Sequence, residues 1–186
     1  MKRTFLLLAA LLVIFPAFSQ ELSTKEQRKL QKELKREQKA EELAQKASLV
    51  GLMVERRQFV LEADQLRDRR GNTSNVTSMI NFIAMDSIRG VIQIGDNRYV
   101  GLNGVGGITI EGRITNYQYT RNERTGAYSV NYSVRSSLGT YDVRMTALPD
   151  GRADANISSN WPGQLNYLGY LVTPAASRVY KGTSSY

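Results

Sequence analysis

The side chains that could do chemistry in this chain are carboxylates, because the sequence contains no histidine and no cysteine. Imidazole is the commonest general base near neutral pH and the commonest transition-metal ligand. Its absence excludes Ser-His and Cys-His triads, and the absence of cysteine excludes disulfides and thiolate metal sites. A carboxylate pair would have to come mainly from the acids after Gly71, which are Asp86, Asp96, Glu111, Glu123, Asp142, Asp150 and Asp154.

The positions of these acids favour structural roles. Three fall in predicted turns: Asp96, Glu123 and Asp150. Glu111 and Asp142 point outward from predicted strands beside Arg113 and Arg144, which predicts cross-strand ion pairs worth at most about 1 kcal/mol each. No pattern places two carboxylates in one dry cleft, and the acids from Asp150 to Asp154 are too few for a calcium loop. The sequence therefore predicts no catalytic, metal or cofactor site and a protein that is not an enzyme. A hydrolase that uses two of these carboxylates is kept as a hypothesis behind the two binding functions given below.

The glycine-rich segment from Gly101 to Gly107 is the first place to look for a phosphate-binding loop. Such a loop needs a helix N-terminus after it and, in nucleoside-triphosphate sites, a nearby lysine. Here a strand pattern begins at Ile108 and no lysine is close. The segment therefore predicts a loop that needs positive φ angles or close approach between strands. Its glycines are also candidates for a binding surface: Gly104, Gly106 and Gly107.

Tyrosine is the other abundant side chain that could recognise a ligand, with 10 copies in the chain. Tyr128, Tyr132 and Tyr141 share strand faces with Val and Met, which predicts core packing. Tyr117 and Tyr119 instead share the parity of Glu111 and Arg113, the predicted outward face. With Trp161 they form a candidate exposed aromatic surface for a sugar or a protein.

Residues 1–19 read as a signal peptide, with basic Lys2 and Arg3, an apolar run from Phe5 to Phe15, and Ala17-Phe18-Ser19 as a cleavage site. The apolar run is too short for a resident membrane helix, and no cysteine is present for lipoprotein modification. We expect a periplasmic or secreted protein with no integral membrane segment after cleavage. The net charge of +8 is not gathered in one stretch, so we expect no nucleic-acid partner.

Residues 20–56 have helix composition, rich in Lys, Glu, Gln, Arg, Ala and Leu. The clearest helical stretch runs from Leu22 to about Ala47, and its leucines do not hold a heptad repeat. A solvated helix is expected, with Val50, Met53 and Val54 docking its end on the following domain.

Residues 57–186 show period-2 alternation and are predicted to form one antiparallel β-domain. Tyr128, Val130, Tyr132 and Val134 mark one strand face. Strands are expected at 59–64, 80–85, 88–94, 98–102, 108–115, 128–135, 141–147, 152–159 and 165–172, with an edge at Val179-Tyr180 and a turn at Pro149-Asp150-Gly151. The fold class is mainly β with an N-terminal α-helix, an antiparallel meander forming a small sandwich or partly open barrel.

Several segments carry a family resemblance. They are Arg57 to Ala63, Asn81-Phe82-Ile83, Val91 to Gly95, Asn103 to Thr109, Gly139 to Val143 and Val179-Tyr180-Lys181-Gly182. From about Ala47 to Thr183 the chain resembles the family catalogued as domain of unknown function number 4251, exported proteins of the Bacteroidota phylum. The resemblance implies envelope or secreted residence and implies no activity or site residue. In that lineage Asp86-Ser87-Ile88 matches a short O-glycosylation pattern, which makes Ser87 a candidate acceptor.

We expect an exported envelope protein that acts as a non-catalytic binding or interaction module. Its partner would be an envelope protein or a glycan. The alternative is a periplasmic carrier that holds a lipid or small apolar ligand in the mouth of a β-barrel.

Overall fold

The computed structural model describes residues 24–96, 98, 101, 103–159 and 164–185. The chain divides into two compact units, residues 1–38 and 39–186. Described residues 25–38 of the first unit are exposed and helical throughout, as their helix-forming composition predicts. The predicted signal peptide, residues 1–19, lies outside the described residues. No helix of the described residues is both long and apolar enough to cross a membrane.

The helix α1 runs from Thr24 to Arg56, so its second half belongs to the second unit. It ends because Arg57 adopts a left-handed conformation, with a φ of 56°, and its amide donates to the Val54 carbonyl at 3.2 Å. Val50, Met53 and Val54 are buried in the same hydrophobic core as the strands. The prediction that these three residues dock the helix end is confirmed.

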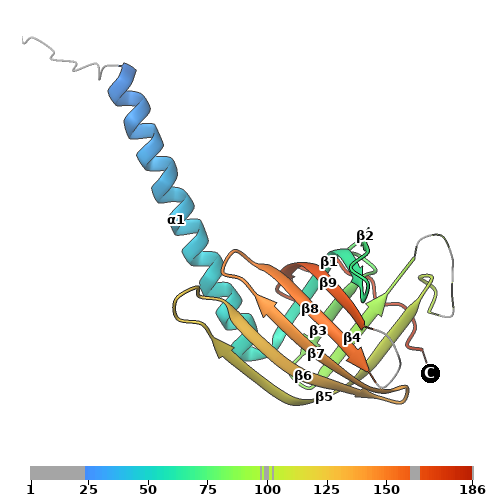
Figure 1. The fold of residues 1–186 in the computed structure, drawn as a ribbon. Coiled ribbons are helices and arrows are strands. Elements are labelled where there is room, and N and C mark those ends of the chain that lie inside the picture. The colour runs from blue at the N-terminus through green and yellow to red at the C-terminus, as the bar shows by residue number, and fades with distance from the viewer. Residues whose placement is uncertain (1–23, 97, 99–100, 102, 160–163, 186) are drawn as a thin grey trace, which may run out of the picture. The chain divides into compact units, whose positions relative to one another are not determined.

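The described residues after α1 form nine strands, all paired antiparallel, and neighbours in the sheet follow the sequence order except at the short β2 (Figure 1). Their bounds are β1 (Gln58–Asp68), β2 (Thr73–Asn75), β3 (Phe82–Asp86), β4 (Arg89–Ile94), β5 (Ile108–Arg121), β6 (Tyr128–Ser136), β7 (Gly139–Ala147), β8 (Arg152–Ser159) and β9 (Gln164–Val172). The predicted antiparallel meander is therefore confirmed. Of the predicted strand at 98–102, three residues lie outside the described residues, and Arg98 and Gly101 are in turn or irregular backbone.

The sheet closes on itself because β9 pairs with β1, from Val60 opposite Val172 to Asp68 opposite Leu165. Eight strands thus form a closed barrel, and β2 adds to one edge of β1. The expected sandwich or partly open barrel is corrected on this point. Local strand patterns indicate a meander, but only the pairing of its first and last strands decides whether it closes.

Side chains fill the interior of the barrel. Alternate residues of each strand point inward, as with Tyr128, Val130, Tyr132 and Val134 of β6, all buried. Tyr167 of β9 is fully buried, and its hydroxyl donates to the backbone carbonyl of Gln93 on β4 at 3.0 Å. This ring therefore fills the space between two strands that are not neighbours in the sheet.

Candidate functional site

Part of the outer face of β3, β4 and β5, around Phe82, Gln93 and Thr109, is covered by residues 177–185, which we call the strap. It is held by backbone hydrogen bonds: the Tyr180 amide donates to the Met79 carbonyl at 2.7 Å, and the Ser185 amide donates to the Thr109 carbonyl at 2.9 Å. Figure 1 shows this C-terminal segment beside the ends of β4 and β5. The strap contains no strand residue, so the edge strand predicted at Val179-Tyr180 is wrong.

Beneath the strap lies Gln93, an outward-facing residue of β4 with no exposed surface. Its Nε2 donates to the carbonyls of Ile80 and Tyr180 at 3.1 and 2.9 Å. Its Oε1 accepts from the Gly182 amide at 2.8 Å and from Thr109 Oγ1 at 3.0 Å. All the hydrogen-bonding capacity of the amide is used within the protein. Gln93 therefore fastens the strap and is not available to a ligand.

The glycine-rich loop packs beside the strap. Gly104 and Gly106 have φ angles of 75° and 76°, and a Cβ on Gly107 would collide with the Ile94 carbonyl oxygen. Asn103 is buried, and its Oδ1 accepts from the Val105 and Gly107 amides at 3.1 and 3.0 Å. The predicted need for positive φ and close backbone approach is confirmed. Two of the backbone amides that could have bound a ligand are thus occupied internally.

Two adjoining hollows lie on the outer wall next to the strap. The first, of about 510 Å³, has an apolar lining from Val60, Ala84, Val91, Pro174 and Ala175 and a polar rim from Gln58, Asp86, Arg89 and Glu111. The second, of about 470 Å³, is lined by Ile88, Arg89, Glu111, Gly112 and Arg113. Because the two share Arg89 and Glu111, they form one groove across β1, β3, β4 and β5. We call it the strap-side groove.

The strap sets the charge of this groove. Lys181 Nζ lies 2.5 Å from Glu111 Oε2, and Ser184 Oγ donates to the same oxygen at 2.8 Å. These two bonds, with the nearby positive charge of Arg89, lower the pKa of Glu111 below its ordinary value. The cross-strand ion pair predicted for Glu111 is therefore wrong, because its carboxylate is held by the strap. Asp142 likewise accepts from Ser133 at 2.7 Å and forms no ion pair with Arg144 among the described residues.

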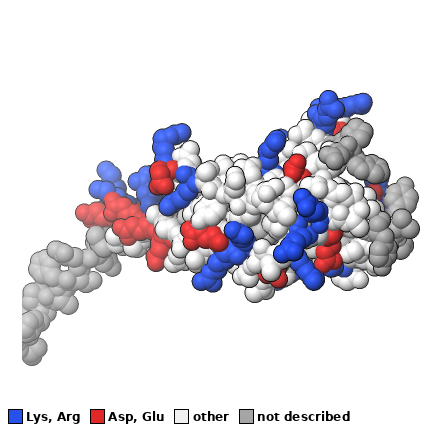
Figure 2. Space-filling model, turned by 90° about the horizontal axis from the view of Figure 1, so that it is seen from below, with Lys and Arg blue, Asp and Glu red and all other residues white. Residues whose placement is uncertain are grey.

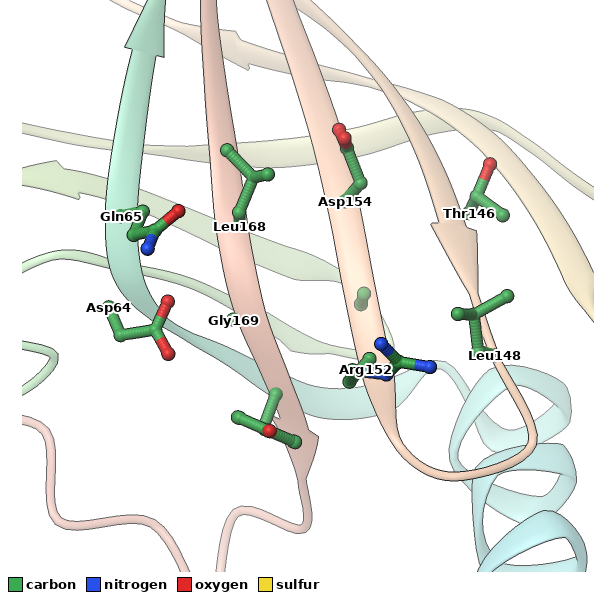
Figure 3. A pocket seen from close by; sticks show the side chains of 10 residues that line it. Asp64, Gln65, Thr146, Leu148, Arg152, Asp154, Leu168 and Gly169 are labelled. Atoms are coloured by element: carbon green, nitrogen blue, oxygen red, sulfur yellow. The ribbon is translucent and has the colours of Figure 1, made fainter. Parts of the chain in front are cut away.

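A separate hollow of about 460 Å³ lies over β1, β7, β8 and β9 (Figure 3). Leu168 and Leu148 line it, together with the charged side chains of Asp64, Arg152 and Asp154. Arg152 is paired with Asp150, with Nε 2.7 Å from Oδ2. In Figure 3 the side chains of Asp64 and Asp154 stand on different strands on either side of β9. The hollow therefore contains no close carboxylate pair of the kind that glycoside hydrolysis requires.

The tyrosines predicted to point outward are displaced by a β-bulge. The pairing of β5 with β6 shifts register between Thr115 and Gln118, and Asn116 has a φ of 55°. Tyr117 is consequently turned toward the barrel end, where its hydroxyl donates to the Val54 carbonyl of α1 at 2.6 Å and burial raises its pKa. The outward orientation predicted for Tyr117 is wrong. Tyr119 is 43% exposed.

The structure brings part of the predicted aromatic surface together. The ring centroids of Tyr117 and Tyr119 lie 6.3 Å apart, and the Arg57 guanidinium lies 4.8 Å from the Tyr117 ring centroid. The glycine-rich loop precedes β5 at its opposite end, roughly 30 Å away at the rise of a strand. Trp161 lies outside the described residues. Tyr117 and Tyr119 therefore form no common surface with Gly104, Gly106 and Gly107.

Ser87 lies in the turn between β3 and β4, with a φ of 45°. Its amide donates to the Arg57 carbonyl at 2.7 Å, and its hydroxyl is 3.5 Å from the Arg56 carbonyl oxygen. The residue is half-buried, and its role as a glycosylation acceptor stays a prediction.

Metal-ligating side chains are scattered over the described part of the chain, where no group of three or more Asp or Glu residues could hold an ion. The groove and the strap were missed by sequence reasoning. The sequence offered one signal for them. A glutamine, Gln93, interrupts an apolar strand, and the C-terminal segment from Val179 to Gly182 is one of the segments that carry the family resemblance.

Comparison with known proteins identifies the family. Residues 38–171 match the family model described as "Domain of unknown function (DUF4251)". The chain belongs to this family. The DUF4251 match covers α1 from Gln38 to its end and nearly all the barrel, and it confirms the resemblance seen in the sequence.

A solved DUF4251 structure shows the same fold. It is the crystal structure of a DUF4251 family protein from Bacteroides eggerthii DSM 20697, with 28% sequence identity and a TM-score of 0.62. The match covers 72% of this chain and 91% of that chain. No curated protein is significantly similar to this chain. Membership of the DUF4251 family brings a fold and no activity, so function must be argued from the site.

Proposed function

We propose that this protein is a non-catalytic binding module of the cell envelope that recognises its partner through the outer wall of its barrel. The observation that carries the proposal is the strap-side groove, in which an apolar lining and a charged rim lie side by side on the outside of the fold. Binding sites combine these two properties, because apolar surface supplies affinity and a few polar groups supply specificity.

The arrangement of the interior supports an outside site. Tyr167 and the inward residues of β6 are buried, and the end of α1 contributes Val50, Met53 and Val54 to the same core. The helix end and Tyr117 are joined by a hydrogen bond, which holds this end of the barrel in place. A ligand inside would have to displace side chains from a packed core, at a cost of several kcal/mol.

Site-specific photo-crosslinking tests this function. A photoreactive residue would replace Ile88, which is 62% exposed and lines the groove. A matched variant would carry the same group at Ser129, an exposed residue of β6 that lines none of the three hollows described. In cells of the source organism, we expect a discrete crosslinked partner from position 88 and none from position 129. Equal products from the two positions, or none from either, would contradict the proposal.

Native mass spectrometry separates this function from the alternative, a carrier of a lipid or small apolar ligand in the barrel mouth. Protein purified from its own envelope should have the mass of the bare chain. A non-covalent apolar adduct without a phosphate group, released on unfolding, would instead favour the carrier.

A further inference from the structure

Three arginines stand in a row on adjacent strands of the outer wall. Arg89 of β4 is directly opposite Arg113 of β5, and Arg113 is directly opposite Arg135 of β6. All three alternate with inward neighbours, so they point to the same outer face, and all three are exposed. Side chains directly opposite one another start about 5 Å apart, so the three arginine side chains begin within roughly 10 Å of one another.

This row carries more positive charge than the acids beside it can balance. None of the three arginines forms an ion pair with an Asp or Glu of the described residues. Two acids lie next to the row: Asp86 of β3, directly opposite Arg89, and Glu111, which is held by Lys181 and Ser184 of the strap. Lys181 balances the charge of Glu111, and Asp86 faces Arg89, so the excess of positive charge is centred on Arg113 and Arg135.

A row of three arginines is unfavourable for the stability of the fold. Like charges directly opposite on neighbouring strands destabilise a sheet, whereas Thr, Ser or Asn would be neutral there. On the face seen from below, Figure 2 shows Lys and Arg side chains interspersed with Asp and Glu. An unpaired row beside a hollow is what a site for a negative group needs, because several guanidinium forks can converge on one oxyanion.

The hollow beside the row provides the space. Arg89 and Arg113 both line the part of the strap-side groove that measures about 470 Å³, and exposed Ile88 forms its edge. A phosphate group occupies only a fraction of that volume, so the remainder of a ligand could extend along the groove toward Val91 and Pro174.

We propose that Arg89, Arg113 and Arg135 form a binding site for an oxyanionic group of two negative charges, with a phosphate monoester as the reference chemistry. The inference rests on the proposed function, since it names the chemical class of ligand for the same outer wall. The phosphate would lie between Arg89 and Arg113, with Arg135 strengthening the field from the next strand.

Thermal unfolding of the full chain tests the site. The probe is sodium phosphate, compared with sodium chloride at the same ionic strength, with wild type beside R113Q. The matched control is R144Q, because Arg144 is an exposed residue of β7 that lies opposite Asn131 and Asn156 and has no arginine neighbour in register. We expect phosphate to raise the Tm of wild type and R144Q and to leave R113Q unchanged, with binding by R113Q about tenfold weaker or more.

A second readout distinguishes a site from general charge attraction. In chloride at low ionic strength, R113Q should unfold at a higher temperature than wild type, because it removes the central charge of the row. R144Q should not. An equal response to phosphate in all three proteins would overturn the inference, as would an R113Q variant less stable than R144Q in chloride.

Two further arms identify the source of the phosphate group. One uses soluble glycerol 3-phosphate, and the other uses phosphatidylcholine vesicles with and without phosphatidic acid. Arg113-dependent binding to either supports the site and assigns it to a soluble ligand or a lipid headgroup. If crosslinking from position 88 persists in R113Q while neither probe binds wild type, the oxyanion site is wrong and the outer-wall binding function stands.

Discussion

The outer wall of this barrel is covered over one part of β3–β5, around Gln93, and open over β7–β9, although the strands alternate in the same way in both regions. On the covered side, outward-facing Phe82, Gln93 and Thr109 have almost no exposed surface. On the open side, outward-facing Thr146 and Asp154 are exposed. The comparison shows that an outward position does not decide exposure. A segment from elsewhere in the chain can cover one face, and every polar group beneath it must then find a partner.

The largest expected effect comes from removing the central amide of the covered side. Q93A would leave the carbonyls of Ile80 and Tyr180 and the Gly182 amide without their partner beneath the strap. We expect a loss of about 2–4 kcal/mol in the free energy of unfolding. Q65A, on the open side, should cost less than about 0.5 kcal/mol. Urea unfolding measures both, and a Q93A cost equal to that of Q65A would break the comparison.

A matched pair of threonines tests the same comparison between the covered and the open side of the outer wall. Thr109 Oγ1 donates to Gln93 and accepts from Asn103 Nδ2 at 3.1 Å, whereas Thr146 is exposed. T109V should destabilise by about 1–3 kcal/mol because it leaves buried groups unpaired. T146V should be within about 0.5 kcal/mol of wild type. Similar values for the two variants would mean that the strap does not exclude water from Thr109.

Two interior tyrosines extend the comparison to the barrel core. Tyr167 donates to the Gln93 carbonyl, but the buried hydroxyl of Tyr132 has no hydrogen-bond partner among the described residues. Y167F should therefore cost about 1 kcal/mol, and Y132F should be neutral or stabilising by a similar amount. Guanidinium unfolding of both variants measures this. A destabilised Y132F would show that an ordered water or another group pairs with that hydroxyl.

The smallest effect concerns the charged end of the strap. Because the folded protein lowers the pKa of Glu111 below 4.5, its pair with Lys181 stabilises the fold above that pH. The contribution is lost as the pH falls through the lowered value. E111Q should cost less than about 1 kcal/mol at pH 7, because the pair is partly solvated, and nothing in strong acid. D154N on the open side is the control. A cost of E111Q that persists in acid would assign it to packing.

The strands could be predicted because their inward residues alternate over many positions. Phe59, Leu61 and Ala63 of β1 and the four residues from Tyr128 to Val134 are buried as expected. The error at Tyr117 has a local cause, since one extra residue at Asn116 reverses parity and nothing in the residue types announces a bulge.

The closure of the barrel and the groove could not be predicted in the same way. Both depend on pairing between distant segments, β1 with β9 and Gln93 with residues 180–182. A glutamine in an outward position is typical of a solvated face, so its burial is invisible without the strap. The row of arginines was hidden for a related reason, because its members are recognisable as neighbours only once the strand registers are known.

The pairing of β1 with β9 also determines how this chain must fold. Residues 60 and 172 meet only after the intervening strands have formed or collapsed, which gives the topology many contacts of high sequence separation. Until that meeting, β1 and β9 each expose a row of unpaired backbone groups that could pair with another chain. We therefore expect slow folding with a late closing step, and a dependence on high dilution or a chaperone to avoid aggregation before that step.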